Sequence, residues 1–315
     1  MSTMSKETRK IFFSIASYEY LRPRFLEAGD FEPADIERKI FPDGERYLRL
    51  AADTWGRDVV LLGGTPTDLD WLEVYDLAYA ITRGGARSLS IVMPYFGYST
   101  MERAVKPGEV VTAKARAMLL SAIPPCEAGT RLFLFDLHTD GIEFYCGEHH
   151  ITRHIYGAPV ITAAIRKLMD GRDYVLGATD AGRAKWVQSL ARELNVEPAF
   201  VYKHRDAGTG TIQLTGINAE VKGKDIVVYD DMIRTGGTLI QAAKAYIHAG
   251  AKSVSAIASH LVLPAKSLDI LRDSGVFQNI LGTDSHPGSE KIRGTHPEAI
   301  HSIAELLVQS LMRPR

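Results

Sequence analysis

The sequence predicts an α/β fold with two tandem domains, each built on a mostly parallel sheet flanked by helices. Two observations lead to this prediction. Short apolar runs of strand length alternate with segments of helical spacing along the whole chain, and such alternation is typical of right-handed crossover units, which form parallel sheets. The series also occurs twice, up to about residue 150 and again from about 156 to 300, and 315 residues are enough for two domains of roughly 150 residues each.

The elements follow one another in regular order. The predicted strands are short runs rich in β-branched and aromatic residues: 11–15, 58–62, 88–93, 131–135, 174–178, 198–202, 226–229 and 253–258. The predicted helices lie between or after them, at about 71–83, 110–122, 160–170, 182–194, 237–249, 264–273 and 298–311. We place the junction between the domains in the segment HHITRHIYGAPV, so that the first domain covers 8–152 and the second 153–308.

Composition and charge favour a globular protein over a nucleic-acid-binding or membrane protein. Hydrophobic residues make up 45% and charged residues 24% of the chain, and 37 basic against 38 acidic residues leave a net charge of -1. The longest apolar runs fall far short of the roughly 20 residues that a membrane span needs. Cys126 and Cys146 have neither metal-ligand spacing nor a disulfide framework. We therefore expect a cytoplasmic location and no nucleic-acid or membrane partner.

One segment, VVYDDMIRTGGT at 227–238, combines groups that suit a phosphorylated sugar. Two carboxylates end a predicted strand, and a Thr-Gly-Gly-Thr sequence then opens a helix. A helix amino terminus has unpaired N–H groups and the positive end of the helix dipole, so it attracts phosphate. The glycines let the backbone approach the phosphate, the threonines add hydroxyl donors, and the carboxylates can accept hydrogen bonds from sugar hydroxyls. The residues predicted to bind the sugar phosphate are Asp230, Asp231, Thr235, Gly236, Gly237 and Thr238.

A purely structural interpretation of this loop is a helix start, with Thr235 as N-cap and the glycines in a turn. That interpretation is sufficient for Thr-Gly-Gly-Thr by itself. It does not explain why two carboxylates at a strand end precede the loop, and the whole segment therefore favours sugar-phosphate binding.

The same segment resembles the phosphoribosyl-pyrophosphate (PRPP) loop of type I phosphoribosyltransferases, and other motifs narrow the resemblance to ribose-phosphate pyrophosphokinases, the PRPP synthetases. The motifs, in the order found in that family, are FPDGE (41–45), MPYFGY (93–98), KPGEVVTAKARAMLL (106–120), FDLHTDGIEFY (135–145), ATDAGRAKW (178–186), VYKHR (201–205) and VVYDDMIRTGGTL (227–239). The resemblance covers nearly the whole chain. It implies two type I phosphoribosyltransferase-like domains, with the nucleotide side in the first and the PRPP loop in the second.

The resemblance implies transfer of the β,γ-diphosphate of ATP to the 1-hydroxyl of ribose 5-phosphate, giving PRPP and AMP, with Mg²⁺ as cofactor. Negative charge develops on the transferred group, so the site needs cations and a metal ion there. Lys203 and Arg205 match the family's catalytic lysine and arginine. His138 would help hold the metal and meet the ATP phosphates, and Asp180 would lie beside the ribose phosphate and a metal.

The FPDGE turn is assigned to the nucleotide by the same resemblance. Its Phe41, Asp43 and Glu45 would stack on or hydrogen-bond the adenine, often across a subunit boundary. The resemblance therefore also implies a homo-oligomer built from dimers, for example a hexamer. From the residues alone, the segment is a hairpin-like Pro-Asp-Gly turn between extended segments.

Two segments depart from the family's pattern. Where the family has Ala-Arg-Gln-Asp-Arg, this chain has STMER, so Thr100 and Met101 replace an arginine and a glutamine that contact ATP, while Arg103 is kept. These three residues are still predicted to contact the nucleotide. In the PRPP loop, Arg234 and Gly236 replace an aspartate and an alanine, which puts a cation beside the phosphate and adds Arg234 to the predicted sugar-phosphate contacts.

These departures leave two alternatives open. One is diphosphate transfer to another acceptor that contains ribose 5-phosphate, such as ADP-ribose. The other is a catalytically idle relative that binds nucleotide or partners and regulates a true synthetase, against which the retained catalytic residues argue. Separately, His150 and His154 form an i, i+4 pair that could bind a metal ion if the segment were helical.

Overall fold

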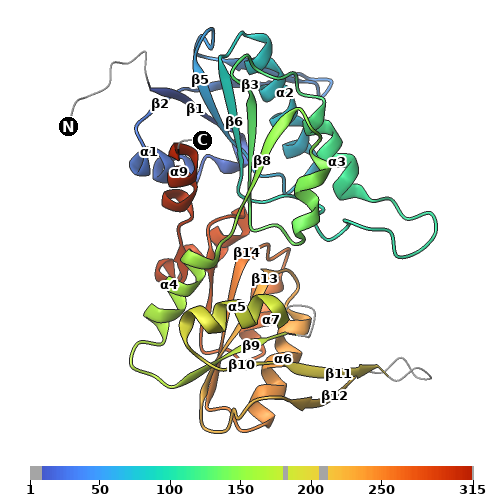
Figure 1. Cartoon of the computed structure of the whole chain (residues 1–315), viewed down its shortest axis with the longest axis vertical. Helices are drawn as coiled ribbons and strands as arrows, with labels where there is room; N and C mark the ends of the chain where they lie inside the picture. The colour runs from blue at the N-terminus through green and yellow to red at the C-terminus, as the bar shows by residue number, and fades with distance from the viewer. Residues whose placement is uncertain (1–8, 180–183, 206–211, 314–315) are drawn as a thin grey trace. The chain divides into compact units, whose positions relative to one another are not determined.

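The computed structural model of the chain describes residues 9–179, 184–205 and 212–313, with the backbone alone at 202–205 and 212–215. The chain divides into two units (Figure 1). Unit 1 runs to Tyr156 and also takes in the segment from Ile303 onward, and unit 2 comprises Gly157–Ser302. No helix in the described ranges is both long and apolar enough to cross a membrane.

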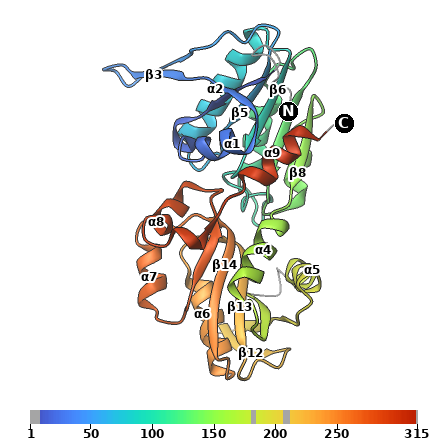
Figure 2. The same ribbon diagram turned by 90° about the vertical axis from the view of Figure 1, so that its left-hand side faces the viewer.

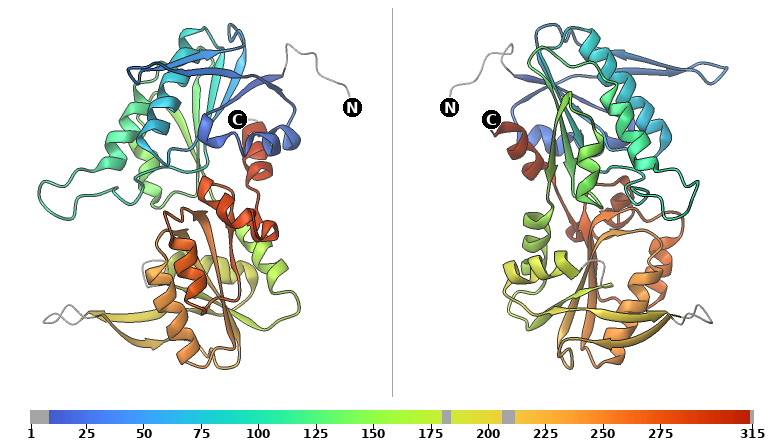
Figure 3. Two further views of the ribbon diagram at one scale, coloured as in Figure 1. Left: turned by 180° about the vertical axis from the view of Figure 1, so that it is seen from behind. Right: turned by 45° about the vertical axis from the view of Figure 1, so that its right-hand side comes forward.

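Unit 1 is built around a parallel sheet covered by helices on both faces (Figure 1; Figure 3). In the described residues this sheet has six strands in the order β2-β1-β5-β6-β7-β8. They are β1 (Lys10–Ser14), β2 (Phe31–Pro33), β5 (Asp58–Leu62), β6 (Ser88–Met93), β7 (Thr130–Phe135) and β8 (His150–Ile155). The helices are α1 (Arg22–Ala28), α2 (Asp68–Arg83), α3 (Thr112–Ser121) and α9 (Ala304–Met312), with 3-10 turns η2 (Ala16–Tyr18) and η3 (Asp140–Tyr145).

The strands of this sheet are buried on both faces, which is why their sequences are continuous apolar runs rather than alternating ones. In β5, for example, the residues 59–62 are each at most 1% exposed. Helix α2, which covers one face, begins with a capping box. Thr67 accepts a hydrogen bond from the Asp70 N–H, and the Asp70 carboxylate accepts one from the Thr67 N–H. This capping box starts α2 at Asp68, one turn before the predicted start at about residue 71.

A two-stranded antiparallel hairpin extends from unit 1 (Figure 2). Strands β3 (Ile36–Ile40) and β4 (Arg46–Leu50) pair from Ile36 with Leu50 to Ile40 with Arg46, and the FPDGE turn joins them. Leu48 and Leu50 pack against the core of unit 1, whereas Ile40 near the turn is 76% exposed. The hairpin is therefore anchored at one end and exposed at the other.

Unit 2 repeats the arrangement of a parallel sheet between two helical layers. In the described residues its six strands follow the order β10-β9-β13-β14-β15-β16. They are β9 (Tyr174–Ala178), β10 (Pro198–Ala199), β13 (Asp225–Ile233), β14 (Ser253–Leu261), β15 (Ile280–Thr283) and β16 (Ile300–His301). The other elements are α4 (Ala158–Leu168), α5 (Ala184–Leu194), α6 (Gly237–His248), α7 (Ser267–Asp273), α8 (Glu290–Arg293), the 3-10 turns η5 (Pro287–Ser289) and η6 (Pro297–Ala299), and the antiparallel ribbon β11 (Val201–Arg205) and β12 (Ile212–Ile217).

Each face of this second sheet has its own apolar core. Helices α4 and α5 cover one face through residues such as Ile165 and Leu190, and α6 and α7 cover the other through Tyr246 and Leu271 (Figure 2). The predicted α/β architecture of two mostly parallel sheets flanked by helices is thus confirmed. All of the predicted strands and helices correspond to observed elements. The strands predicted at 58–62, 88–93 and 174–178 have the observed bounds, and the ends of the others are shifted.

The sequence did not predict the short or polar elements. The missed elements are β2, β8, β12, β15, β16, α1 and α8, whereas β3 and β4 are the extended segments expected on either side of the FPDGE turn. The segment predicted as the junction contains β8, an edge strand of the first sheet, and unit 2 begins only at Gly157. On this strand His150 and His154 are not an i, i+4 helical pair. The His150 Nε2 lies 2.9 Å from the Leu120 carbonyl oxygen, and the Leu137 N–H donates to the His154 Nε2 at 2.9 Å.

The last helix also differs from the prediction. The helix predicted at 298–311 begins only at Ala304, after η6 and β16, and it belongs to unit 1, whereas the predicted second domain extends to 308. Leu307, Val308 and Leu311 join the apolar core of unit 1, and α9 packs beside α1. Apolar burial rather than proximity in sequence decides which unit this helix joins.

Burial of His286, in the GTDSHP segment of unit 2, makes stability depend on pH. Burial, together with nearby His260 and Lys291, lowers the pKa of His286 to about 3, while its Nδ1 accepts a hydrogen bond from the Gly288 N–H. The folded pKa is below the unfolded value of 6.5, so the unfolded state binds the proton more readily and stability is lost as pH falls below 6.5.

We expect His286→Asn, which keeps an acceptor for the Gly288 N–H, to remove up to about 1.4 kcal/mol of acid destabilisation per pH unit below 6.5. Urea unfolding at pH 7 and pH 5 measures this difference, and His296→Asn, at an exposed histidine, is the control. An equal loss of stability on acidification in wild type and His286→Asn would contradict this prediction.

Candidate active site

The loop after β13 has the geometry that the sequence predicts for phosphate binding. β13 lies between β9 and β14 in the sheet, and its carboxyl end leads through residues 234–236 into α6. Gly236 is the N-cap of α6 and has φ +82°, in the left-handed region that favours glycine. The first turn of α6 therefore offers backbone N–H groups and the positive end of the helix dipole at this edge of the sheet.

A cavity of about 220 Å³ lies at this loop. It is lined by Asp230, Met232, Ile233, Arg234, Thr235, Gly236, Gly237, Thr238 and Leu239. The side chains of Arg234, Thr235 and Thr238 are exposed, so a guanidinium and two hydroxyls are accessible beside the helix terminus. This donor set, with one carboxylate at the other end of the segment, suits a phosphate attached to a group that bears hydroxyls.

The two adjacent carboxylates differ in their surroundings. Asp230 lines the cavity, where its Oδ2 accepts a hydrogen bond from the Thr179 Oγ1 at 3.3 Å and its Oδ1 accepts one from the Asp231 N–H at 3.0 Å. Asp231 is 5% exposed and does not line the cavity. Successive side chains of a strand point to opposite faces, which accounts for the difference. Thr179, which the sequence reasoning missed, is a further residue at this site.

The predicted catalytic residues lie on the ribbon of unit 2. Lys203 and Arg205 belong to β11, which pairs with β12 from Val201 with Ile217 to Arg205 with Ile212, with an irregularity in register between Tyr202 and Lys203. The predicted metal and ribose-phosphate ligand Asp180 lies outside the described residues, directly after the described end of the β9 segment.

The predicted adenine contacts lie at the exposed turn of the β3–β4 hairpin in unit 1. The Phe41 N–H donates to the Glu45 carbonyl at 2.8 Å, and the Asp43 Oδ1 accepts from the Glu45 N–H at 3.1 Å. Phe41 is 46% exposed, and its ring meets Tyr47 edge-on at 6.3 Å between centroids. The turn is thus ordered by its own hydrogen bonds, while one face of the Phe41 ring is left for a partner.

The loop after β6 contains the predicted nucleotide residues Thr100, Met101 and Arg103, all of them exposed. The Ala113 N–H, at the start of α3, donates to the Met101 carbonyl at 3.3 Å. The Tyr145 hydroxyl donates to the Glu102 carbonyl at 2.9 Å. These hydrogen bonds fix the backbone of the loop from which the exposed side chains of Thr100, Met101 and Arg103 extend.

Tyr98, in the same loop, takes part in a charged cluster at the start of α2. Its hydroxyl donates to Asp68 Oδ1 at 2.8 Å, and the Arg116 guanidinium donates to the same oxygen at 2.6 Å. The hydrogen bond from Tyr98, assisted by Arg116, holds the pKa of Asp68 below its usual range. Arg116 also lies over the Tyr98 ring, 5.3 Å from its centroid. This cluster ties the loop to α2 and α3.

His138 follows β7, and its side chain is partly exposed. Loops that follow parallel strands lie at the same edge of a sheet, so His138 and the loop after β6 belong to the carboxyl edge of the first sheet, where α/β proteins bind ligands. Tyr145, from the segment after His138, makes the contact to Glu102 described above. The structure thus places Tyr145 in contact with the predicted nucleotide loop, and the role of His138 stays a prediction.

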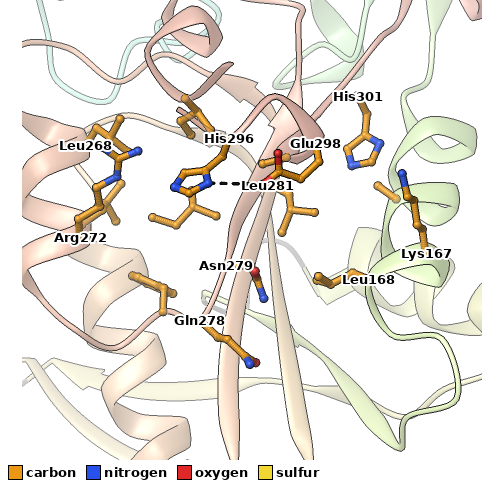
Figure 4. Close-up of a pocket in the computed structure, with 16 residues that line it drawn as sticks. Lys167, Leu168, Leu268, Arg272, Gln278, Asn279, Leu281, His296, Glu298 and His301 are labelled. Carbon is orange, nitrogen blue, oxygen red and sulfur yellow. Dashed lines mark ion pairs between the residues drawn. The ribbon is translucent and has the colours of Figure 1, made fainter. Parts of the chain in front are cut away.

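A larger cavity, of about 410 Å³, lies elsewhere in unit 2 (Figure 4). Lys167 of α4, Arg272 of α7 and the paired His296 and Glu298, whose Nδ1 and Oε1 are 3.4 Å apart, surround an apolar floor that includes Leu281. No predicted site residue lines it. It borders the beginning of β15, whereas ligand sites of α/β sheets lie outside the carboxyl ends of strands. The smaller cavity at the β13–α6 loop is therefore the candidate site.

The described residues contain no group of three or more His, Cys, Asp or Glu side chains that could hold a metal ion. Mg²⁺ is commonly bound by one or two carboxylates together with substrate phosphates and water rather than by a cage of protein ligands. Asp230 presents one carboxylate to the candidate cavity, so its donor chemistry fits Mg²⁺ bound with a phosphorylated ligand.

Both units are similar to known proteins of one family. Residues 10–123 match the family model for the N-terminal domain of ribose phosphate pyrophosphokinase, and residues 155–283 match that for the phosphoribosyl transferase domain. The chain is 31% identical to a ribose-phosphate pyrophosphokinase of Gloeobacter violaceus, over 98% of this chain and 91% of the relative. It is 33% identical to one of Saccharolobus solfataricus, over 79% of this chain and 84% of the relative.

A solved structure gives the same result. The phosphoribosylpyrophosphate synthetase from Mycobacterium smegmatis is similar with a TM-score of 0.84 and 26% identity, over 96% of this chain and 97% of that one. The likeness extends over both units and not over a single domain.

Proposed function

Because the chain belongs to the ribose-phosphate pyrophosphokinase family, we propose that it transfers the β,γ-diphosphate of ATP to the 1-hydroxyl of ribose 5-phosphate, releasing PRPP and AMP. The observation that carries this proposal is the cavity at the start of α6, where a helix amino terminus, two threonine hydroxyls and Arg234 surround space for a phosphate. Whole-chain similarity to enzymes of this name supports the same activity over a non-catalytic role.

Each part of ribose 5-phosphate has a complementary group in the proposed site. The 5′-phosphate accepts hydrogen bonds from the N–H groups at the start of α6 and from Thr235 and Thr238. The Asp230 carboxylate accepts hydrogen bonds from ribose hydroxyls, with its orientation supported by the Thr179 hydroxyl. This orientation directs the 1-hydroxyl away from the phosphate end, toward the group that is transferred. The role of Asp231, which is buried, stays a prediction.

Unit 1 carries the residues that we propose for the nucleotide. Phe41 offers an exposed aromatic face for adenine, and Asp43 and Glu45 in the same turn supply acceptors for its amino group. Arg103 supplies an exposed cation in the loop after β6. Thr100 and Met101 add no charge, so the proposed contacts to the ATP phosphates rely on Arg103 in this loop and on His138, which follows β7.

Chemistry in the proposed mechanism consists mainly of positioning and charge stabilisation. Lys203 and Arg205 neutralise the charge that builds on the diphosphate as the ribose 1-hydroxyl attacks the β-phosphorus and the bond to AMP breaks. In unit 2, Asp180 and Asp230 would hold Mg²⁺, which when bound supplies positive charge to the phosphate oxygens, and the role of His138 as a metal ligand stays a prediction. The proton of the 1-hydroxyl passes to solvent, AMP leaves with the electron pair of the broken P–O bond, and the diphosphate stays on the ribose.

We also propose that the chain acts as a homo-oligomer. Ile40 is 76% and Phe41 46% exposed at the end of the hairpin, and large apolar side chains exposed at one place favour cover by another molecule. A second copy of the chain would supply that cover together with the adenine site. A cytoplasmic location stays a prediction.

An AMP-release assay with a panel of acceptors tests the proposed function. Purified protein, ATP and Mg²⁺ are expected to yield AMP with ribose 5-phosphate, and AMP release is expected to stop when EDTA removes the metal. ADP-ribose, ribose and no acceptor are the other arms. Turnover with ADP-ribose but not with ribose 5-phosphate would show that the acceptor is ADP-ribose instead. Absence of AMP in every arm would refute the proposed activity.

A further inference from the structure

Glu73 of α2 is the buried centre of a polar cluster that joins the hairpin to unit 1. Its carboxylate is 2% exposed. Its Oε1 accepts hydrogen bonds from the Ala16 N–H at 3.0 Å and from the Arg38 Nε at 2.9 Å, and its Oε2 accepts one from the Arg46 guanidinium at 2.5 Å. Arg38 belongs to β3 and Arg46 to β4, so one carboxylate contacts both strands of the hairpin.

The hairpin needs such an anchor because an isolated two-stranded ribbon is at best marginally stable in water. Its strands form a sheet of their own in the described structure, separate from the sheet of unit 1. The ion pairs within it, such as Arg49 with Glu37 at 2.7 Å, are exposed, and exposed pairs contribute little to stability. Leu48 and Leu50 supply apolar anchoring near the far end of β4. The end that carries FPDGE relies on Arg46, which directly follows the turn.

The electrostatics of the cluster make Glu73 hard to replace. Burial by itself would raise the pKa of Glu73, but hydrogen bonds from the Ala16 N–H, Arg38 and Arg46 outweigh it and lower the pKa. The carboxylate is therefore charged at neutral pH. Arg38 keeps another partner, the Ser14 carbonyl at 2.8 Å, if Glu73 is removed. Arg46 keeps only a weak contact at 3.4 Å to the Leu69 carbonyl among its described hydrogen bonds.

We propose that Glu73 is a positioning residue for the nucleotide: by binding Arg38 and Arg46 it holds the FPDGE turn where Phe41 can stack on the base. The inference rests on the proposed function, because the turn is assigned to adenine there. Glu73 does not itself touch substrate. Its loss leaves the chemistry at the β13–α6 loop intact and loosens one wall of the nucleotide site.

Steady-state kinetics test this role with Glu73→Gln, which keeps the volume of the side chain and removes its charge. We expect the KM for ATP to rise at least tenfold while kcat and the KM for ribose 5-phosphate change less than threefold. Arg46→Met removes the other partner of the ion pair, on the hairpin, where the side chain is 30% exposed. It is expected to raise the KM for ATP in the same way, and it replaces Glu73→Gln as the test if that variant fails to fold.

A double variant identifies the pair itself. If Glu73 and Arg46 act together, Glu73→Gln/Arg46→Met raises the KM for ATP no more than the larger single effect. Glu32→Gln is the matched control, because Glu32 lies on β2 and binds the Arg57 guanidinium at 2.6 Å in the same unit. It is expected to leave the KM for ATP unchanged.

Hydrogen exchange of the apoprotein separates this inference from the proposed function. Glu73→Gln is expected to speed exchange of amides in 36–50, such as the Phe41 N–H that donates to the Glu45 carbonyl, while amides of β5 and β6 keep their protection. Hydrogen exchange reports how firmly Glu73 holds the hairpin, even if no acceptor in the assay yields AMP. Unchanged exchange, an unchanged KM for ATP, or a fall in kcat alone would each overturn the positioning role.

Discussion

Lys203→Ala is expected to lower kcat by about a thousandfold while the KM values for ATP and ribose 5-phosphate change only a few-fold. The transferred diphosphate gains charge as its bond to AMP breaks, and a cation aimed at that charge acts in the transition state more than in the bound substrates. Removal of one such group typically costs about a hundred- to a thousandfold in rate. Lys203 lies on β11 and pairs through its backbone with Leu214 of β12. This pairing does not depend on the lysine side chain.

The measurement is AMP release at saturating substrates, with circular dichroism as the check on folding. Lys244→Ala, at an exposed lysine on α6, is the control for loss of one positive charge from the same unit and is expected to keep the wild-type kcat. Lys203→Arg is expected to recover part of the rate because it keeps the charge but changes its geometry. Near-normal turnover of Lys203→Ala would remove this residue from the catalytic set.

Gly236→Ala is expected to raise the KM for ribose 5-phosphate about a hundredfold. Gly236 has φ +82°, and a Cβ built there would lie 2.5 Å from Leu271 Cδ2 and 2.8 Å from its Cγ. Leu271 is fully buried, and the close packing of the core opposes its displacement. The loop must shift instead, and a displacement of about 1 Å at a positioning group can cost about a hundredfold in activity. The left-handed backbone adds about 1–2 kcal/mol of strain.

The variant Gly223→Ala provides a close control. Gly223 has φ +74° in the turn before β13, and a Cβ there would meet nothing within 4 Å. Its replacement introduces the same kind of backbone strain without the clash and away from the cavity. We expect Gly223→Ala to lower stability by about 1 kcal/mol and to leave the KM for ribose 5-phosphate unchanged. Equal KM values in the Gly236→Ala and wild-type enzymes would show that the loop tolerates the side chain, against the proposed phosphate site.

The candidate sugar-phosphate site could be predicted well because its parts are consecutive in sequence. β13, the loop and the start of α6 form one strand–loop–helix segment, and local backbone geometry suffices to bring the helix N–H groups, Thr235 and Thr238 around one cavity. The buried strands were predictable for a similar reason, since continuous apolar runs can be recognised one segment at a time.

The short and the polar strands were harder to predict. β15 and β16 are four and two residues long, and β3 and β4 carry many charged residues, so neither apolar periodicity nor run length marks them as strands. These strands form because a neighbouring strand supplies hydrogen-bond partners. The same dependence explains β8, whose polar sequence was interpreted as a junction until its pairing with β7 was known.

The sequence by itself determined the α/β class, the two sheets and the loop that suits a phosphate, because each is specified by residues close together in the chain. Tertiary structure alone decided that α9 joins unit 1, that Asp230 rather than Asp231 lines the cavity, and that Glu73 binds Arg38 and Arg46. Those outcomes depend on which distant groups share one buried space. Burial and charge pairing settle them only once the whole unit has packed.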